Sequence, residues 1–306
     1  MAASSEKPVI GYLPQDTPPI GAMLSLGFQQ VLTMFPATVL VAVLTKFDVG
    51  VTLFASGLGT IIALLVSGRR IPLYYGSSFS YIAVIITVMS RFAGDCFKDP
   101  NTVYCPEGVR IAQVGILGTA IFEILVGLLI QRIGKERLDR VLPPIVTGSI
   151  AITIGIALAG AALNMAAANW AIAFVTLLLT IIFSVYLQGR GLLGMLPIML
   201  GAAAGYVISL IFGLVDFTRV SQALWVQVPH FTFPAFGDAR AYGYVLSVAL
   251  IAIATIPEST AHLYQMSLYI DELAAELKRK PLEIKRLIGL NPVSYTHLTL
   301  PTSDLV

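Results

Sequence analysis

The chain has 306 residues, of which 57% are hydrophobic and only 12% are charged. Soluble domains carry about 25% charged residues, so this composition excludes an ordinary soluble protein and indicates one embedded in a membrane. The formal net charge of +2 gives no sign of a nucleic-acid partner. No nucleotide-binding, catalytic or metal-ligating spacing of residues occurs, which argues against an enzyme and against a metal centre.

Eight apolar stretches follow one another along the chain, each close to the roughly 20 residues that a helix needs to cross a bilayer. We predict membrane segments at 22–44, 51–67, 71–90, 110–130, 142–163, 169–187, 192–214 and 242–267. Residues 1–21 lack the apolar core of a signal peptide, so the first segment is expected to act as the insertion signal. The pattern predicts an all-α, multi-pass membrane protein.

The Lys and Arg residues predict which side of the membrane each connection faces. With the N-terminus in the cytoplasm, most of them fall in cytoplasmic segments, namely Lys7, Arg69, Arg70, Arg132, Lys135, Arg137, Arg140, Arg190, Lys278, Arg279, Lys280, Lys285 and Arg286. We therefore expect the N-terminus inside. This orientation places Cys96 and Cys105 in one outer loop, on the oxidising side of the membrane. Whether they form a disulfide stays open.

The third segment differs from its neighbours because a proline, a glycine and two serines occur within residues 72–78, and all of them disfavour an unbroken helix. We predict an extended stretch over Leu73–Gly76 and a half-helix that starts near Ser78 or Phe79. From there to Arg91 the helix would be about 20 Å long, too short for a hydrocarbon core of about 30 Å. Broken helices of this kind mark the substrate sites of secondary transporters. The alternative is a packing notch of small residues.

The eighth segment carries an acid where an apolar helix is expected. A carboxylate such as Glu258 costs about 2.5–3.5 kcal/mol at the centre of a membrane helix, which makes it a functional candidate. Pro257 precedes it and predicts a kink, and His262 follows on the same helical face. The alternative is that both side chains only satisfy polar groups of neighbouring helices. For Glu123, in the fourth segment, we favour packing or snorkelling toward the inner face over function.

Four stretches together resemble the motifs of a known family. They are FQQVLTMFPATVL (Phe28–Leu40), IPLYYGSSF (Ile71–Phe79), LPPIVTG (Leu142–Gly148) and PESTAH (Pro257–His262). In this order and spacing they resemble successive motifs of the nucleobase–cation symporters, the nucleobase/ascorbate transporter family. The resemblance runs from about Leu24 to Leu290.

The resemblance implies a fold of fourteen membrane segments in two inverted repeats of seven, of which about eight are present here. Segments at 22–130 and 242–267 would belong to a core domain, and those at 142–214 to a gate domain. Residues 1–21 would form a cytoplasmic tail, and 268–291 a cytoplasmic loop with the start of a ninth segment. In this family the third and tenth segments each contain a short strand and a half-helix, and the base binds between them.

Carried over residue by residue, the resemblance also assigns a site. Glu258 would hydrogen-bond the base, His262 would lie beside it and take part in proton coupling, and Phe79 with its backbone would form a second wall. The rest of the substrate-binding set is Gly76, Ser77 and Ser78, and the residues expected to line the pocket are Tyr75, Gln29 and Gln30. The last two stand where the family has a Gln–His pair, so the first segment offers no imidazole.

The activity that the resemblance implies is proton-coupled uptake of a nucleobase, uracil or a purine such as xanthine, across the bacterial inner membrane. Sodium is the less favoured coupling ion, no cofactor is expected, and full-length members form homodimers through the gate domain in surrounding lipid. Two alternatives remain. One is an anion transporter of similar fold, which Glu258 disfavours because a carboxylate repels an anion. The other is a non-functional fragment of a nucleobase permease.

The end of the chain changes character after Asn291. Residues Pro292–Val306 (PVSYTHLTLPTSDLV) are rich in Ser and Thr and resemble translated sequencing-adapter read-through. We therefore expect a truncated gene product with a non-native tail. A natural short homologue with a polar tail is the alternative.

Overall fold

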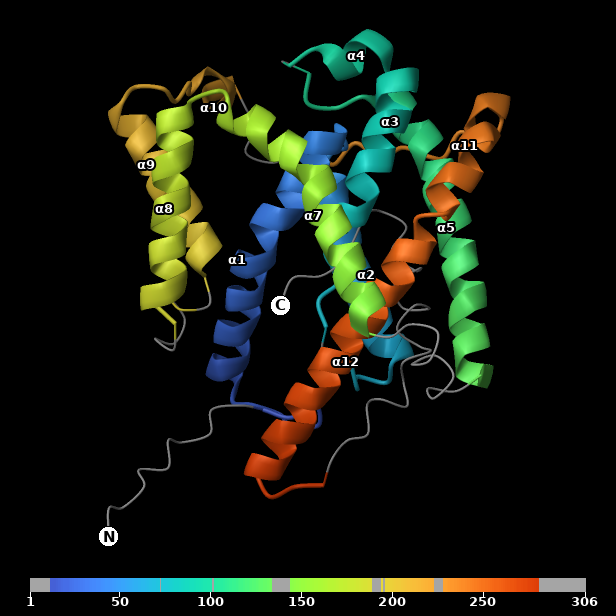
Figure 1. Ribbon diagram of the computed structural model, residues 1–306, viewed down its shortest axis with the longest axis vertical. Coiled ribbons are helices and arrows are strands. Elements are labelled where there is room, and N and C mark those ends of the chain that lie inside the picture. Colours follow the sequence, from blue (N-terminus) through green and yellow to red (C-terminus); the bar gives the residue numbers. More distant parts are fainter. Residues whose placement is uncertain are drawn as a thin grey trace.

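The computed structural model describes residues 12–71, 73–100, 102–133, 144–188, 194, 196–222 and 228–280. Every regular element in these ranges is helical (Figure 1). The helices are α1 (Ile20–Thr45), α2 (Val49–Val66), the 3₁₀ turn η1 (Phe79–Tyr81), α3 (Ile82–Phe92), α4 (Gly94–Lys98), α5 (Pro106–Ile133), α7 (Pro144–Ala166), α8 (Trp170–Tyr186), α9 (Pro197–Ile211), α10 (Thr218–Gln222), α11 (Ala239–Ala249) and α12 (Ala252–Glu276). The side chains of 257–265, the segment 281–291 and the tail 292–306 lie outside the described part.

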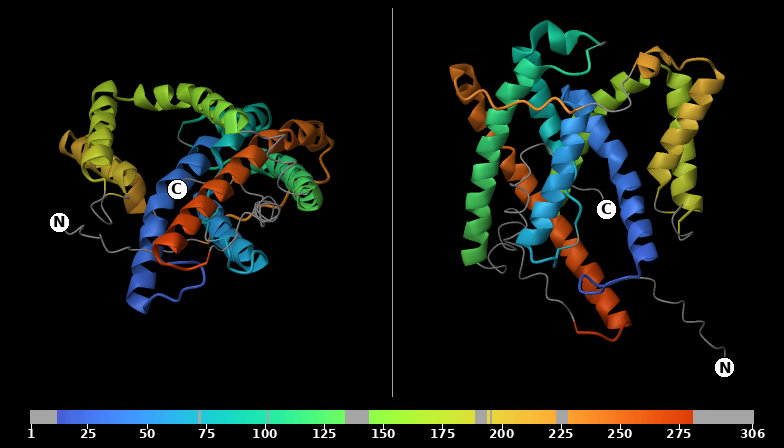
Figure 2. Two further views of the ribbon diagram at one scale, coloured as in Figure 1. Left: turned by 60° about the horizontal axis from the view of Figure 1, so that its bottom comes forward. Right: turned by 180° about the vertical axis from the view of Figure 1, so that it is seen from behind.

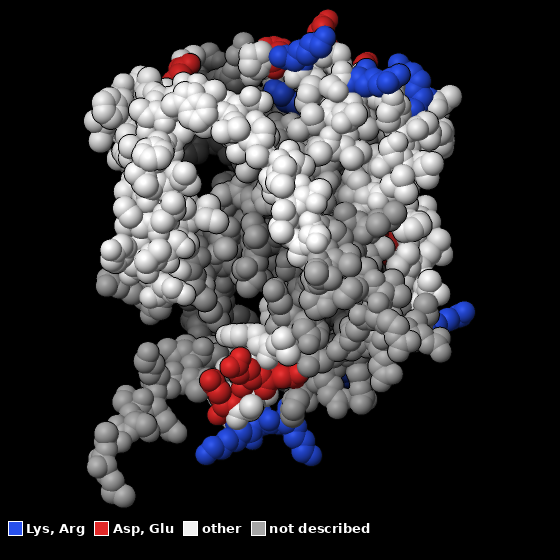
Figure 3. Space-filling view, in the orientation of Figure 1, with Lys and Arg blue, Asp and Glu red and all other residues white. Residues whose placement is uncertain are grey.

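Six of the predicted membrane segments are single helices, α1, α2, α5, α7, α8 and α9, with ends within a few residues of the predicted ones. By length and composition, three stretches of the described chain can cross a membrane: Ile20–Thr45, Val49–Val66 and Pro106–Leu129. Shorter apolar helices occur at Phe79–Phe92, Gly155–Ala166, Trp170–Tyr186 and Pro197–Ile211. On the face drawn in Figure 3, charged side chains gather at both ends of the molecule and hardly occur in the band between them. A band without charged side chains is expected where a protein crosses a bilayer, because charged side chains are costly in the hydrocarbon core.

The two ends of the bundle are built from different parts of the chain. Residues 12–19 and the last turn of α12 lie at one end, and α4 with residues 228–238 lies at the other (Figures 1 and 2). At the first end Leu13 is buried, and Asp16 accepts a hydrogen bond from Arg279 that lowers the pKa of Asp16. The described part of the predicted N-terminal tail, from Tyr12 on, is thus docked on the bundle. Which end faces the cytoplasm stays a prediction.

Two buried apolar clusters join the first five helices to α11 and α12. The first surrounds the third segment and consists of Leu13, Ala63, Ile71, Leu73, Tyr75, Ala252, Ile256, Ile270, Leu273 and Ala274. The second joins α1, α3, α5 and α11 near the α4 end. Both clusters therefore connect segments far apart in sequence, as the predicted core domain requires. The division into core and gate domains itself stays a prediction.

The eighth predicted segment is two helices rather than one kinked helix. The break lies at Leu250–Ile251, and α12 runs without a break from Ala252 past position 257 to Glu276. A kink at Pro257 stays a prediction. At the break the amide of Ile251 bonds to the carbonyl of Val248 at 3.1 Å, in place of an α-helical partner. The Thr119 hydroxyl of α5 donates to the same carbonyl at 2.9 Å. A contact from a distant helix therefore stabilises the break, which local sequence does not reveal.

Helix α5 approaches α11 closely because of a glycine. A Cβ atom at Gly115 would lie 2.7 Å from the Val248 side chain, closer than side-chain carbons pack. Small residues let membrane helices approach in this way. The contact brings α5 against the break between α11 and α12.

Helices α8 and α9 form a pair at one side of the bundle in every view (Figures 1 and 2). They pack mainly against each other, with Gly201 and Gly205 of α9 facing Thr180 and Thr176 of α8. This pair lies within the predicted gate domain.

Candidate functional site

The third segment begins as an extended stretch held against α2, as predicted. The Tyr75 amide donates to the Thr60 hydroxyl at 3.0 Å, and that hydroxyl donates to the Ser56 carbonyl at 2.8 Å. Tyr75 is fully buried. In the described part this stretch is not a strand.

A half-helix follows where the sequence predicted it. Ser78 caps the turn Phe79–Tyr81, because its side chain accepts a hydrogen bond from the Ser80 amide at 3.3 Å, and α3 continues from this turn. Ser77 and Ser78 are both buried, and the Ser77 hydroxyl has no hydrogen-bond partner in the described part of the chain. A helix start inside the protein directs free amides and a positive dipole end toward that place.

Helix α1 forms one side of this turn. Met34 is buried, and its Cε atom lies 3.6 Å from where a Cβ atom at Gly76 would be. Gln29 is half-buried and Gln30 is exposed, about one turn earlier in α1. Of the predicted pocket-lining residues, Tyr75 is therefore buried and Gln29 half-buried, whereas Gln30 is exposed.

The opposite side is α12, which carries Glu258 and His262. Ile256, two residues before Glu258, belongs to the same buried cluster as Leu73 and Tyr75 of the extended stretch. Residues next to the two predicted walls therefore share one buried apolar cluster. The side chains of Glu258 and His262 lie outside the described part, so their roles stay predictions.

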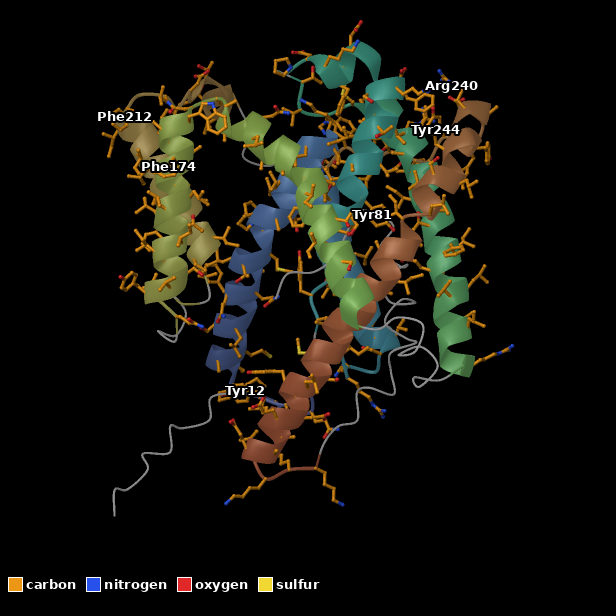
Figure 4. All side chains as sticks on the ribbon, in the orientation of Figure 1. Tyr12, Tyr81, Phe174, Phe212, Arg240 and Tyr244 are labelled. Carbon is orange, nitrogen blue, oxygen red and sulfur yellow. A yellow bond between two sulfur atoms is a disulfide. The ribbon has the colours of Figure 1, made fainter. Side chains whose placement is uncertain are left out.

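A polar contact that the sequence did not reveal lies between these walls. Glu123 of α5 is buried, with 5% of its surface exposed. Its Oε1 accepts a hydrogen bond from the Thr255 hydroxyl of α12 and a longer one, 3.5 Å, from the Tyr81 hydroxyl. The Tyr81 hydroxyl also interacts with those of Thr119 and Thr255. Figure 4 shows Tyr81 in the interior of the bundle, close to α12.

Of the two structural alternatives predicted for Glu123, packing and snorkelling toward the inner face, the buried side chain agrees with packing. The side chain turns into the bundle, where two hydroxyl donors reach it. The signal available in the sequence was the carboxylate itself, within an apolar span from Pro106 to Leu129. Its partners could not be read from the sequence, because they come from helices 42 and 132 residues away.

Comparison with known proteins decides the family. The profile of a family described as the Permease family matches residues 21–279, most of the chain. The uracil permease of Bacillus caldolyticus is 33% identical over 295 residues, 92% of this chain. The chain belongs to the nucleobase–cation symporter family. The members of this family that it resembles are membrane permeases rather than enzymes.

Two further relatives of this chain are similar over comparable lengths. The uracil permease of Bacillus subtilis (strain 168) is 32% identical over 263 residues, covering 81% of this chain and 57% of the relative. A putative pyrimidine permease of Escherichia coli (strain K12) is 31% identical over 271 residues, covering 86% and 58%. The Bacillus caldolyticus relative is covered over 63% of its length. The chain thus spans about six tenths of the length of these relatives.

At the α4 end of the bundle, Cys96 and Cys105 form a disulfide, which settles the point that the sequence left open. It ties α4 to the start of α5. Lys46 supports the same loop, because its backbone carbonyl accepts from the Cys105 amide at 3.1 Å and its side chain donates to carbonyls of Asp99 and Thr102.

An acid–imidazole pair ties residues 228–235 to this end. Asp48 caps α2 by accepting from the Val51 amide at 2.9 Å, and its Oδ2 lies 2.8 Å from Nδ1 of His230. The Tyr104 ring stacks on His230, with centroids 5.9 Å apart. Partial burial tends to raise the pKa of Asp48. The hydrogen bonds from Val51 and His230 outweigh it, so this pKa is lowered below the usual 3.8.

We expect Asp48→Ala to lower the free energy of unfolding by about 0.5–2 kcal/mol near pH 7, because a helix cap is lost. The lowered pKa of Asp48 means that the ionised carboxylate stabilises the fold above the unfolded-state pKa. That contribution disappears as the pH falls through the folded-state value, below 3.8. Thermal unfolding from pH 7 to pH 3 should therefore show the difference shrinking. Asp48→Asn, which keeps a capping oxygen, should lose less; an equal loss in both variants would contradict the capping role.

Proposed function

We propose that this chain forms the greater part of a proton-coupled nucleobase transporter, with uracil as the preferred base and xanthine or another purine as the runner-up. The observation that carries the proposal is the broken third segment, whose capped half-helix starts beside the helix that carries Glu258. The printed names of three relatives, two uracil permeases and a putative pyrimidine permease, support the substrate class.

The proposed chemistry follows from the shape of a base. Uracil is neutral and flat and presents paired N–H and C=O groups at its edge. Backbone amides at the start of the half-helix, other than the Ser80 amide that Ser78 caps, can donate to the carbonyls. A carboxylate accepts strongly from the N–H groups. Phe79 can stack on the ring. Protonation of Glu258, with His262 beside it, would then link proton movement to base binding.

Three further parts of the proposal concern the setting. The transporter would lie in the inner membrane with its N-terminus in the cytoplasm, as the Lys and Arg distribution favours. It would form homodimers in its full-length form, and protons rather than sodium ions would drive it. The disulfide is consistent with an N-terminus in the cytoplasm, because this orientation places the Cys96–Cys105 loop on the oxidising side of the membrane.

The alternatives differ in what they bind. An anion transporter would need a site that attracts anions, whereas Glu258 would repel them. A non-functional fragment would bind neither class, and the shorter length relative to the matched permeases is the observation in its favour. Sequencing the gene beyond the codon for Asn291 decides whether further membrane segments follow.

Binding of radiolabelled uracil to the purified chain tests the proposal. We expect unlabelled uracil to compete fully, xanthine to compete less, and sulfate or ascorbate not to compete. In proteoliposomes, an inward proton gradient should drive accumulation, and a sodium gradient of the same size should not. Displacement of uracil by sulfate would favour the anion transporter. Absence of any binding would favour the fragment.

A further inference from the structure

The buried carboxylate of Glu123 lies between the two walls of the proposed site. Tyr81, one of its donors, ends the turn that starts with Phe79. Thr255, the other donor, lies on α12 three residues before Glu258. A single oxygen atom, Oε1, accepts both hydrogen bonds. Glu123 therefore connects the half-helix, α5 and α12 at one point.

The surroundings of this contact favour an ordered arrangement. Tyr81, Thr119, Glu123 and Thr255 are all buried, at 8%, 0%, 5% and 3% exposure. Thr119, one turn before Glu123 in α5, donates a hydrogen bond to the Val248 carbonyl at the break that separates α11 from α12. Buried polar groups bonded in this way resist displacement, because moving one strands its partner without a hydrogen bond. The start of α12 and the start of the half-helix are thus both fixed to α5.

We propose that Glu123 is a positioning residue for nucleobase binding, which sets the half-helix that starts at Phe79 against the part of α12 that carries Glu258. This inference rests on the proposed function for its link to the base. Its structural part, the joining of two helix starts through one carboxylate, does not. A base held between two walls requires both walls at the correct spacing. In enzymes, a misplacement of reacting groups by about 1 Å can lower the rate about a hundredfold, and we expect a similar sensitivity for base binding.

The first test is uracil binding and transport by the whole chain carrying Glu123→Ala or Glu123→Gln. We expect Glu123→Ala to raise the KM and the dissociation constant for uracil about ten- to a hundredfold, by analogy with such displacements. The maximal rate should change less. Glu123→Gln keeps an acceptor oxygen of the same reach and should recover most of the affinity. The control is Glu107→Ala, which removes an exposed acid from the first turn of the same helix.

The second test needs no substrate. Hydrogen exchange of backbone amides should speed up in Glu123→Ala within residues 79–85 and 252–256, and stay unchanged in α8 and α9. Thr255→Val, which removes one donor and keeps the shape, should give a smaller effect in the same two segments. Equal exchange in all variants, or faster exchange throughout the chain, would overturn the proposal.

The two tests separate the two ideas. If the unsubstituted chain binds no uracil, the proposed function fails, and the exchange pattern still decides whether Glu123 joins the two helix starts. If the unsubstituted chain binds uracil and Glu123→Ala binds it equally well, the positioning role fails while the proposed function stands. Recovery of uracil affinity in Glu123→Gln, together with faster exchange in Glu123→Ala limited to residues 79–85 and 252–256, would support both the proposed function and the positioning role.

Discussion

Replacing Glu258 with glutamine is expected to weaken uracil binding about ten- to a hundredfold. A hydrogen bond to a charged acceptor contributes about 1.5–3 kcal/mol, and each 1.4 kcal/mol corresponds to a factor of ten. Glutamine has nearly the same size, so α12 should keep its packing against the extended stretch. The change removes the negative charge and turns one acceptor into a donor, which would face an N–H group of the base. Equilibrium binding of radiolabelled uracil to the purified chain measures the loss.

The matched control for this experiment lies on the same helix. Glu272 is exposed near the end of α12, so Glu272→Gln makes the same chemical change away from the two walls. We expect its uracil affinity to equal that of the unsubstituted chain. If Glu258→Gln also keeps its affinity within twofold, Glu258 does not contact the base, and the assignment carried over from the family is wrong.

The same variant also separates binding from coupling. Exchange of labelled for unlabelled uracil across a vesicle membrane moves no net protons, whereas accumulation requires proton flow. If Glu258 carries the coupling proton, saturating uracil should restore exchange in Glu258→Gln but not accumulation driven by a proton gradient. Restored accumulation would assign the coupling proton to another group, with His262 the next candidate.

Features that depend on neighbouring residues could be predicted from the sequence. The extended stretch and half-helix of the third segment follow from Pro72, Gly76 and the capping serine, because these residues limit the backbone directly. The capping hydrogen bond from the Ser80 amide to Ser78 shows why the helix starts there. The helix positions in six segments follow from apolar length for the same local reason.

Features that depend on distant contacts could not be predicted. The break at Leu250–Ile251 is stabilised by Thr119, and the direction of Glu123 is decided by Tyr81 and Thr255. An intramembrane carboxylate shows that partners must exist, but not which helices supply them. The candidate site was therefore predicted as two walls, and the contact that joins them was missed.

The second large effect concerns the stability of the α8–α9 pair. Gly201→Ala is expected to lower the free energy of unfolding by about 1–3 kcal/mol, the usual cost of overpacking. An added Cβ atom would lie 1.9 Å from the Thr180 hydroxyl oxygen, 2.9 Å from its Cβ and 3.1 Å from its Cα. Rotating the Thr180 side chain moves the oxygen but neither carbon. That oxygen also donates to the Thr176 carbonyl at 2.8 Å, so rotation breaks a hydrogen bond.

The two helices must therefore separate to admit one methyl group, and the helix-forming advantage of alanine, about 1 kcal/mol at most, does not compensate. The control is Gly57→Ala in α2, where nothing lies within 4 Å of the added carbon. That variant should be neutral or slightly stabilised in thermal unfolding. Adding Thr180→Gly to Gly201→Ala removes the opposing Cβ and should recover part of the loss. If Gly201→Ala unfolds at the same temperature as Gly57→Ala, the close contact of α8 with α9 does not exist in the membrane.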